Sequence, residues 1–481
     1  MESKITSHGE WYIPETDETI SGTLQINKKS KQIILTLVAL ATENDPLGKI
    51  KVFGRTDFIK GKLSSGGNIL LFDCNIGGQH QELLRRTTVV VTVKYAFWNL
   101  DLNDKQDLEF KKAKVNFGEI IQWSGLCAFD WEIQSDQNTE MLKWECKDNI
   151  KFDIDDNLKL EIEPQLGPQS YYVTSNEMTI NQYVFMYFEY LEAVSWNVIL
   201  DDIKTLNSLL ILGMNRSVYI DEIWYFHESH ISQHGCIQEM EVFQGNFVEG
   251  KHQPGIWHDY LFDINDLVNN NFNCLKNWYS KYEKLRVIVN LYESAFVFKD
   301  ISMEILFLNL AQALETYHAR FVSDNLNEYI DLVDDFLRRT FELSQEDEFS
   351  EHIGSYRKIL IAQDANKKFI TLKSRLGYLF LAKFEFVFSF LDYNRGDFIQ
   401  TTLDTRNYFT HYSADKENKI FPKEKLPYVN GILIAVLQYY LLKEIGIDEN
   451  KIAEKVGQQI GGIETAYQLD NKVFINPIES C

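Results

Sequence analysis

The stretch MEILFLNLAQALETYHARF, residues 303–321, decides the fold class of the second half of this chain. Its large apolar residues recur at intervals of three and four, which places them on one side of a helix. These residues are Met303, Leu306, Phe307, Leu310, Leu314, Tyr317 and Phe321. The stretch therefore predicts a helix whose apolar face is buried against other helices.

The segments on either side continue the helical pattern. We predict further helices over residues 275–294, 326–342 and 428–446, the last ending at Gly446, a residue that suits the left-handed position after a helix. The apolar run 376–391 also predicts a buried helix. It is shorter than the roughly 20 residues needed to cross a membrane, and Lys383 and Glu385 interrupt it.

The first half of the chain has a different period. Short runs rich in Val, Ile, Thr and aromatic residues alternate with turn-forming clusters, which predicts an antiparallel sandwich or open barrel. The predicted strands cover residues 22–26, 31–40, 49–56, 68–75, 86–98, 149–154, 158–164 and 217–227. One helix, over 196–212, interrupts them.

Together these patterns predict an α+β multidomain protein, with a β-rich sandwich or barrel-like region followed by an all-α bundle. We expect a β-rich region over 1–270, a helical domain over 271–465 and a tail over 466–481.

Composition limits the partners. Of 481 residues, 45% are hydrophobic, which is typical of a globular protein, and the formal net charge is −22. That charge disfavours broad nucleic-acid binding, which depends on Lys and Arg. The six cysteines are scattered without a Cys-x-x-Cys pair, and the first ten residues lack the apolar core of a signal peptide. We therefore expect a cytoplasmic protein with no membrane and no DNA partner.

A second helix, near residue 400, combines apolar and polar positions. Asp397 and Gln400 have the spacing of a capping box, which predicts that the helix begins there. Four residues spaced by four then form one row along it, and the row turns from apolar to polar: Ile399, Leu403, Asn407 and His411. Arg406 lies at the edge of this row. An unpaired charge is costly inside a core, so this end of the helix needs a polar partner or an opening to solvent.

The segment RNYFTH, residues 406–411, resembles the Arg-x(4–6)-His motif of the HEPN superfamily, and Asn407 matches the polar residue that often follows the arginine. Other stretches resemble ApeA-type anti-phage proteins in the same order. Residues 304–321 resemble the first long helix of their HEPN-like domain, and 277–292 resemble the helix before it. GEWYIPETDETISGTL (9–24) and NILLFDC (68–74) resemble the ApeA N-terminal domain, with Gly9, Trp11, Pro14 and Gly22 as marks.

The resemblance implies a metal-independent endoribonuclease that needs no cofactor. Its catalytic residues would be Arg406, Asn407 and His411. An imidazole can move protons near neutral pH, and a guanidinium can stabilise the extra charge on a reacting phosphate. Glu315 would pair with Arg406 or fix the site, or the two would form a merely structural ion pair.

The resemblance also implies a homodimer with a composite active site, because one chain supplies one motif histidine. The segment 351–430 has 13 basic and 9 acidic residues, a net charge of about +4 in an acidic protein. We predict RNA contacts from its basic residues, unless these form an ordinary solvated face. They are Arg357, Lys358, Lys367, Lys368, Lys373 and Arg375. Tyr408 and Tyr412 are candidates for base stacking, with core packing as the alternative.

The stretch HESHISQHGC (227–236) suggests a metal site, but its spacing matches no standard zinc motif. A surface loop is the preferred interpretation of its candidate ligands, which are His227, His230, His234 and Cys236.

The ApeA resemblance implies abortive infection, in which the front half senses a phage component or restrains the nuclease. Transfer RNA is one candidate substrate. The main alternative is a non-catalytic HEPN module that binds RNA or dimerises, with a ligand-binding β half. A carbohydrate-binding sandwich with a helical oligomerisation tail is a third interpretation, supported only by the aromatic content of 14%.

Overall fold

The computed structural model describes most of the chain. The described residues are 4–14, 19–39, 54–82, 86–98, 108–118, 120–127, 129–134, 139–145, 147–166, 181–231, 237–245, 260–298, 300–344, 353–354, 356–358, 360–361, 369–380, 384–412 and 414–475. They divide into two compact units. Unit 1 contains residues 1–207 and 218–257, and unit 2 contains residues 208–217 and 258–481.

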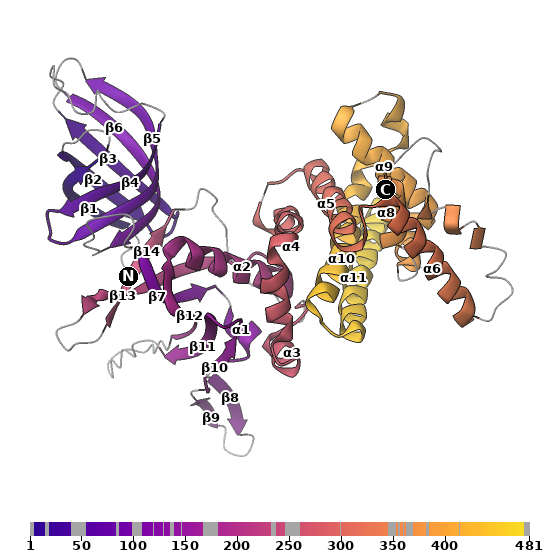
Figure 1. Ribbon diagram of the computed structural model, residues 1–481, viewed down its shortest axis with the longest axis horizontal. Helices are drawn as coiled ribbons and strands as arrows, with labels where there is room; N and C mark the ends of the chain where they lie inside the picture. Colours follow the sequence, from indigo (N-terminus) through magenta and orange to yellow (C-terminus); the bar gives the residue numbers. More distant parts are fainter. Residues whose placement is uncertain are drawn as a thin grey trace, which may run out of the picture. The chain divides into compact units, whose positions relative to one another are not determined.

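Unit 1 begins with a closed barrel of six antiparallel strands (Figure 1). The strands are β1 (Lys4–Tyr12), β2 (Thr19–Asn27), β3 (Gln32–Ala39), β4 (Arg55–Leu63), β5 (Asn68–Glu82) and β6 (Arg86–Trp98). Their order is β6-β3-β2-β1-β4-β5, and β5 pairs back with β6 to close the circle. Closure pairs both edge strands without a second sheet. The barrel form of the prediction is therefore confirmed, and the barrel is closed where an open one was predicted.

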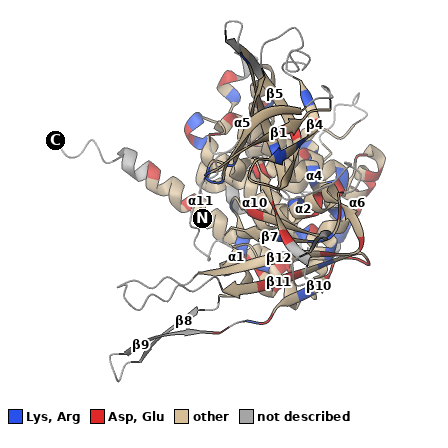
Figure 2. Ribbon diagram, turned by 90° about the vertical axis from the view of Figure 1, so that its left-hand side faces the viewer, with Lys and Arg blue, Asp and Glu red and all other residues tan. Residues whose placement is uncertain are grey.

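The same sheet continues beyond the barrel as an open half. Its strands are β7 (Glu109–Phe117), β10 (Ile150–Asp153), β11 (Leu158–Leu166), β12 (Gln182–Ser195), β13 (Ile220–Ile231) and β14 (Ile237–Gln244). They follow β6 in the order β14-β13-β7-β12-β11-β10, of which β7, β12, β11 and β10 can be followed in Figure 2. A separate hairpin joins β8 (Phe129–Gln134) and β9 (Thr139–Trp144), and α1 covers Ile120–Ser124. The predicted strand 49–56 lies mostly outside the described residues.

Trp11 organises the barrel core. Its side chain is fully buried, and it lies directly opposite Gly61 in the pairing of β1 with β4. A Cβ atom built on Gly61 would lie 2.3 Å from the indole, and one on Gly22 would lie 2.9 Å from it. Gly9 faces the backbone of Lys62, whose carbonyl oxygen would lie 2.5 Å from an added Cβ. Three of the four residues that mark the opening segment therefore have a structural role. Trp11 fills the barrel core, and Gly9 and Gly22 lie where a side chain has no room.

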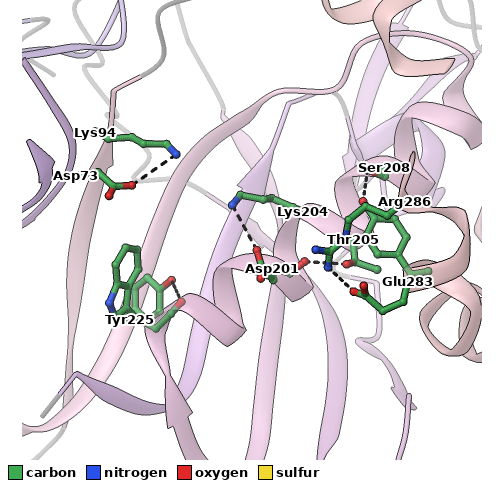
Figure 3. A network of polar contacts seen from close by, with 11 residues as sticks. Asp73, Lys94, Asp201, Lys204, Thr205, Ser208, Tyr225, Glu283 and Arg286 are labelled. Carbon is green, nitrogen blue, oxygen red and sulfur yellow. Dashed lines mark hydrogen bonds and ion pairs between the residues drawn. The ribbon is translucent and has the colours of Figure 1, made fainter. Parts of the chain in front are cut away.

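Helix α2 (Trp196–Met214) confirms the helix predicted over 196–212. Trp196 anchors it to unit 1 through ring contacts with Phe72, Tyr95 and Phe97 at centroid distances of 5.2–5.4 Å. Further along the helix, the buried hydroxyl of Thr205 donates to the carbonyl of Asp201 at 2.8 Å (Figure 3). Residues 208–214 of α2 belong to unit 2.

Unit 2 is helical. Its α-helices are α3 (Ile264–Asn269), α4 (Asn273–Val297), α5 (Met303–Tyr317), α6 (Leu326–Ser344), α8 (Leu372–Leu379), α9 (Arg395–His411), α10 (Leu426–Ile445) and α11 (Glu449–Ile475). Helix α5 contacts α4, α8, α9 and α10. Helix α10 contacts α4, α5 and α11. It ends at Gly446 with φ +88°, as predicted. Within the described ranges, no helix is both long and apolar enough for a membrane crossing.

The single helix predicted over 376–391 is wrong. The segment contains the end of α8 and a 3-10 helix over Glu385–Leu391. In a straight α-helix, residues eight apart are separated by about 12 Å along the axis. Here the ring centroids of Phe380 and Phe388 are 5.4 Å apart, and both rings contact Phe398, at centroid distances of 5.7 and 4.4 Å. The break in the helix brings the two rings onto one partner.

The fold class and the helices that flank residues 303–321 are confirmed. The predicted boundaries at residues 270 and 465 stay predictions.

The barrel core gives a stability prediction. Gly61→Ala should lower the free energy of unfolding by about 1–3 kcal/mol, since the new methyl group overlaps the Trp11 indole. Gly457→Ala, at an exposed position of α11 with nothing within 4 Å, should raise it by about 0.5–1 kcal/mol. Denaturant titration of both variants measures this. Equal stability of Gly61→Ala and the wild type would contradict the prediction.

Candidate active site

Helix α9 carries the predicted motif, and it begins earlier than the sequence suggested. Asn394 is the N-cap residue, with an extended backbone, and its side-chain oxygen accepts the N–H of Asp397 at 2.9 Å. The prediction of Asp397 as the cap is therefore wrong. Asp397 lies in the first turn, where its carboxylate accepts a hydrogen bond from the Asn394 amide and has the favourable sign for a helix N-terminus.

One face of α9 is fixed in the core of unit 2. Its buried residues are Phe398, Ile399, Thr402, Thr405 and Phe409. The Phe409 ring contacts Phe307 of α5 at 6.0 Å, and the Thr405 hydroxyl accepts the backbone N–H of Phe421 at 2.9 Å. Hydroxyls on the buried face are thus hydrogen-bonded, and α9 is held against α5 in one rotational setting.

The motif residues lie where α9 leaves the core. Arg406 forms an ion pair with Glu315 of α5, with Nη2 and Oε2 3.7 Å apart. The two side chains are 31% and 28% exposed, so solvent reaches both. Arg406 Nη1 also donates to the side-chain oxygen of Asn407 at 3.4 Å. His411, the last residue of α9, is exposed.

The row that ends at His411 passes from interior to solvent. Ile399 is buried, Leu403 and Asn407 are partly exposed, and His411 is exposed. Arg406 precedes His411 by five residues, which corresponds to about 140° of rotation around the helix axis and about 7.5 Å along it. The guanidinium and the imidazole of one chain therefore leave α9 in different directions.

The family models match nearly the whole of this architecture. The model of ApeA N-terminal domain 1 matches residues 6–278, more than half of the chain. This chain belongs to the ApeA family. The model of the Apea-like HEPN domain matches residues 308–451, which include Glu315 and all of α9. The two matches fit an anti-phage HEPN protein. No curated protein and no solved structure gives a significant match.

The tyrosines of the HEPN motif helix differ in exposure. Tyr412 follows α9 in the left-handed conformation, with φ +49°, and is 69% exposed. Its ring contacts that of Tyr408 at 5.5 Å, and Tyr408 is partly exposed. Phe409 is therefore a buried core residue, whereas Tyr408 and Tyr412 are accessible at the surface.

The predicted basic residues of the HEPN region do not share one environment. Arg357 forms a bidentate ion pair with Asp334 at 2.6 and 3.0 Å, and Lys358 is exposed. Lys373 donates to the side chain of Gln400 on α9 at 2.9 Å. Lys367 and Lys368 lie outside the described residues.

Arg375 does not fit its predicted role at the surface. Its side chain is 6% exposed, and its guanidinium donates to Asp324 at 2.6 Å and to Nδ1 of His318 at 3.2 Å. A buried charge needs such a partner, so the side chain stabilises the interior and cannot lie along an RNA backbone in this arrangement.

His318 was not recognised from the sequence. It is fully buried and opens a π-helical segment, His318–Val322, directly after α5. Burial, assisted by the positive charge of Arg375, lowers the pKa of His318 to about 3. The ring is therefore neutral at physiological pH. Helical spacing does not distinguish a buried histidine from an exposed one, so the burial of His318 could not be predicted.

The structure describes only some of the four candidate metal ligands. His227 lies on β13, where its ring contacts Phe110 at 5.5 Å. His230 is on the same strand, but its side chain is not described, and His234 and Cys236 lie outside the described residues. The described part of the chain holds no group of three or more His, Cys, Asp or Glu side chains suited to a metal ion.

The buried histidine predicts a pH effect on stability. The unfolded chain binds a proton at His318 below about pH 6.5, whereas the folded chain excludes it until about pH 3. The contribution of His318 to the free energy of unfolding is therefore fully present above about pH 6.5, and it falls by about 1.4 kcal/mol per pH unit below that pH. The variant His318→Gln should show a correspondingly shallower loss between pH 6.5 and 4.5 in denaturant titrations. Parallel curves for the two proteins would contradict this.

Proposed function

We propose that this chain is a metal-independent endoribonuclease of anti-phage defence that cuts RNA during infection and so stops growth of the host cell. HEPN domains are usually nucleases, and they commonly bind RNA and dimerise. The observation that carries the proposal is the arrangement at the end of α9, where a partly exposed Arg406 is paired with Glu315 and His411, five residues later, is exposed.

RNA contains its own nucleophile, so no metal-bound water is needed. The 2′-hydroxyl attacks the neighbouring phosphorus, a new P–O2′ bond forms and the P–O5′ bond breaks. The products are a 2′,3′-cyclic phosphate and a 5′-hydroxyl. His411 takes the 2′-hydroxyl proton or donates one to the leaving oxygen. Arg406 donates to the phosphate oxygens as their negative charge increases.

Glu315 and Asn407 act as positioning residues in this proposal. Glu315 holds the guanidinium of Arg406 near the surface of α5, and Asn407 accepts from the same guanidinium. Because the ion pair is partly solvated, its contribution to stability is small, about 1 kcal/mol or less. A phosphate can therefore compete for the arginine.

The second proton-transfer group comes from a second copy of the chain. Acid and base roles require two groups, and each chain supplies one motif histidine. Since Arg406 and His411 diverge by about 140° on one helix, an antiparallel pair of α9 helices would place one chain's imidazole near the other chain's guanidinium. We propose a homodimer with a composite cleft.

The basic segment 351–430 would guide the RNA, with Arg357, Lys358 and Lys373 as the described candidates and Lys367 and Lys368 as untested ones. Exposed Tyr412 and partly exposed Tyr408 could stack on unpaired bases. Transfer RNA is the proposed substrate class. The ApeA N-terminal domain would sense a phage component or hold the nuclease inactive until infection.

Two substitutions test the catalytic roles. Arg406→Ala and His411→Ala should each reduce RNA cleavage about 100-fold or more, because each removes a group used in the transition state. Arg339→Ala, at an exposed arginine of α6, is the matched control and should cleave like the wild type. RNA ends from infected cells that express each variant measure the effect. Full cleavage by both site variants in folded protein would refute the proposal and favour a non-catalytic HEPN module.

Chelation tests the metal-free chemistry separately. Cleavage by purified protein should persist in excess EDTA, and every new 3′ end should carry a cyclic phosphate, since the 2′-oxygen remains bonded to phosphorus. Ends with a free 3′-hydroxyl, or loss of activity that added Mg²⁺ restores, would show a different mechanism.

A further inference from the structure

The outer face of the open half-sheet in unit 1 repeats one arrangement of charge and aromatic rings along β7. Lys112, Lys114 and Asn116 alternate on this strand and share the face. Each is flanked by residues of β12 and β13 on the same face. The cross-strand partners are Glu189 and Phe226 for Lys112, Tyr187 and Trp224 for Lys114, and Phe185 and Glu222 for Asn116.

At the first two positions a lysine lies between aromatic rings and pairs with a carboxylate. The Lys112 ammonium lies 4.5 Å from the Tyr187 ring and 2.5 Å from Glu189. The Lys114 ammonium lies 4.3 Å from Phe185 and 4.7 Å from Trp224, and it donates to Glu239 at 2.8 and 2.9 Å. Lys114 is 6% exposed, so this environment accommodates a cation that is almost removed from water.

The third position has one ring, Phe185, and one carboxylate, Glu222, as cross-strand partners, but an asparagine in place of the lysine. Asn116 forms a hydrogen bond with Glu222, which is partly buried. Burial, together with the charge of Glu241, raises the pKa of Glu222 above its usual value. A neutral amide thus occupies the place where the two preceding positions provide an ammonium group.

A cavity of about 510 Å³ lies at this third position. It is open to solvent and lined by residues of β2, β3, β7, β12, β13 and β14, all in unit 1. Asn116, Glu222, Tyr183, Phe185 and Trp224 form part of its wall. Tyr183 is 37% exposed and stacks on Phe185 at 5.8 Å. The volume is in the range of small-molecule sites. We call this cavity the β7 pocket.

Two lysines also line the β7 pocket, and both already have acceptors. Lys28 pairs with Glu241 at 2.6 Å and lies 4.9 Å from the Phe243 ring. Lys31 donates to the backbone carbonyls of residues 220 and 221 at 2.9 and 2.8 Å, and burial lowers its pKa. Neither ammonium is directed to an incoming anion, so these lysines do not make the cavity a phosphate site.

We propose that the β7 pocket binds an organic cation, a guanidinium or alkylammonium group, which takes the place that lysine fills at the two preceding positions of β7. Glu222 supplies the carboxylate, and Tyr183, Phe185 and Trp224 supply the aromatic wall. The cation comes from an arginine or lysine side chain of a polypeptide, or from a free amine. The site lies within the ApeA N-terminal domain match, and its occupation does not depend on the nuclease chemistry of α9.

Calorimetry on the full chain tests the site. The probes are agmatine, the peptide acetyl-Gly-Arg-Gly-amide and the same peptide with citrulline, an uncharged isostere of arginine. Both cations should bind and the citrulline peptide should bind at least about tenfold more weakly. An arginine peptide that binds tenfold tighter than agmatine indicates a polypeptide ligand. Equal affinities indicate a free amine.

Variants of the β7 pocket separate this site from adventitious binding. Asn116→Lys places the chain's own ammonium at the third position, so it should abolish binding of both cations. Asn116→Gln, which adds length without charge, should retain it. Glu222→Gln should weaken binding by at least about tenfold and serves if Asn116→Lys does not fold. Unchanged binding by Glu222→Gln, equal binding of the citrulline peptide, or no heat from any probe would overturn the proposal.

Discussion

The packing of Phe409 against Phe307 sets the orientation of α9, and the candidate site depends on it. This contact, together with the hydrogen bond from the Phe421 backbone to Thr405, fixes which side of the helix is buried. Once that side is fixed, Arg406 must lie near Glu315 of α5, and His411 must lie at the exposed end. The rotation of α9 about its axis therefore keeps the polar residues of the motif out of the interior.

In each unit, one nearly buried charged side chain has a partner of opposite charge. In unit 1 the ammonium of Lys114 is enclosed by rings and paired with Glu239, and in unit 2 the guanidinium of Arg375 is paired with Asp324. Removing a charge from water is costly, and a carboxylate with hydrogen-bonding geometry offsets the cost. The two arginines of unit 2 differ in this respect, since Arg406 is 31% exposed with a partly solvated partner, whereas Arg375 is 6% exposed.

The sequence was sufficient for features that depend on local periodicity. The apolar stripe of 303–321, the end of α10 at Gly446 and helix α2 all follow from spacing and turn residues. The pairing of Glu315 with Arg406 was one of two roles inferred from the resemblance, and the ion pair is present. Features that depend on distant parts of the chain were not predictable. Spacing cannot show that Arg375 is enclosed by Asp324 and His318, or that the run after residue 376 breaks to bring two rings together.

Strand β6 belongs to both halves of the sheet, because it pairs with β3 and β5 in the barrel and with β14 in the open half. The barrel strands are all complete at residue 98, whereas β14 begins at residue 237. During synthesis from the N-terminus, the barrel can close on the ribosome long before its neighbour exists. Until β14 emerges, the edge of β6 at Tyr95–Phe97 has an open hydrogen-bonding side, and nascent chains are then most vulnerable to wrong partners.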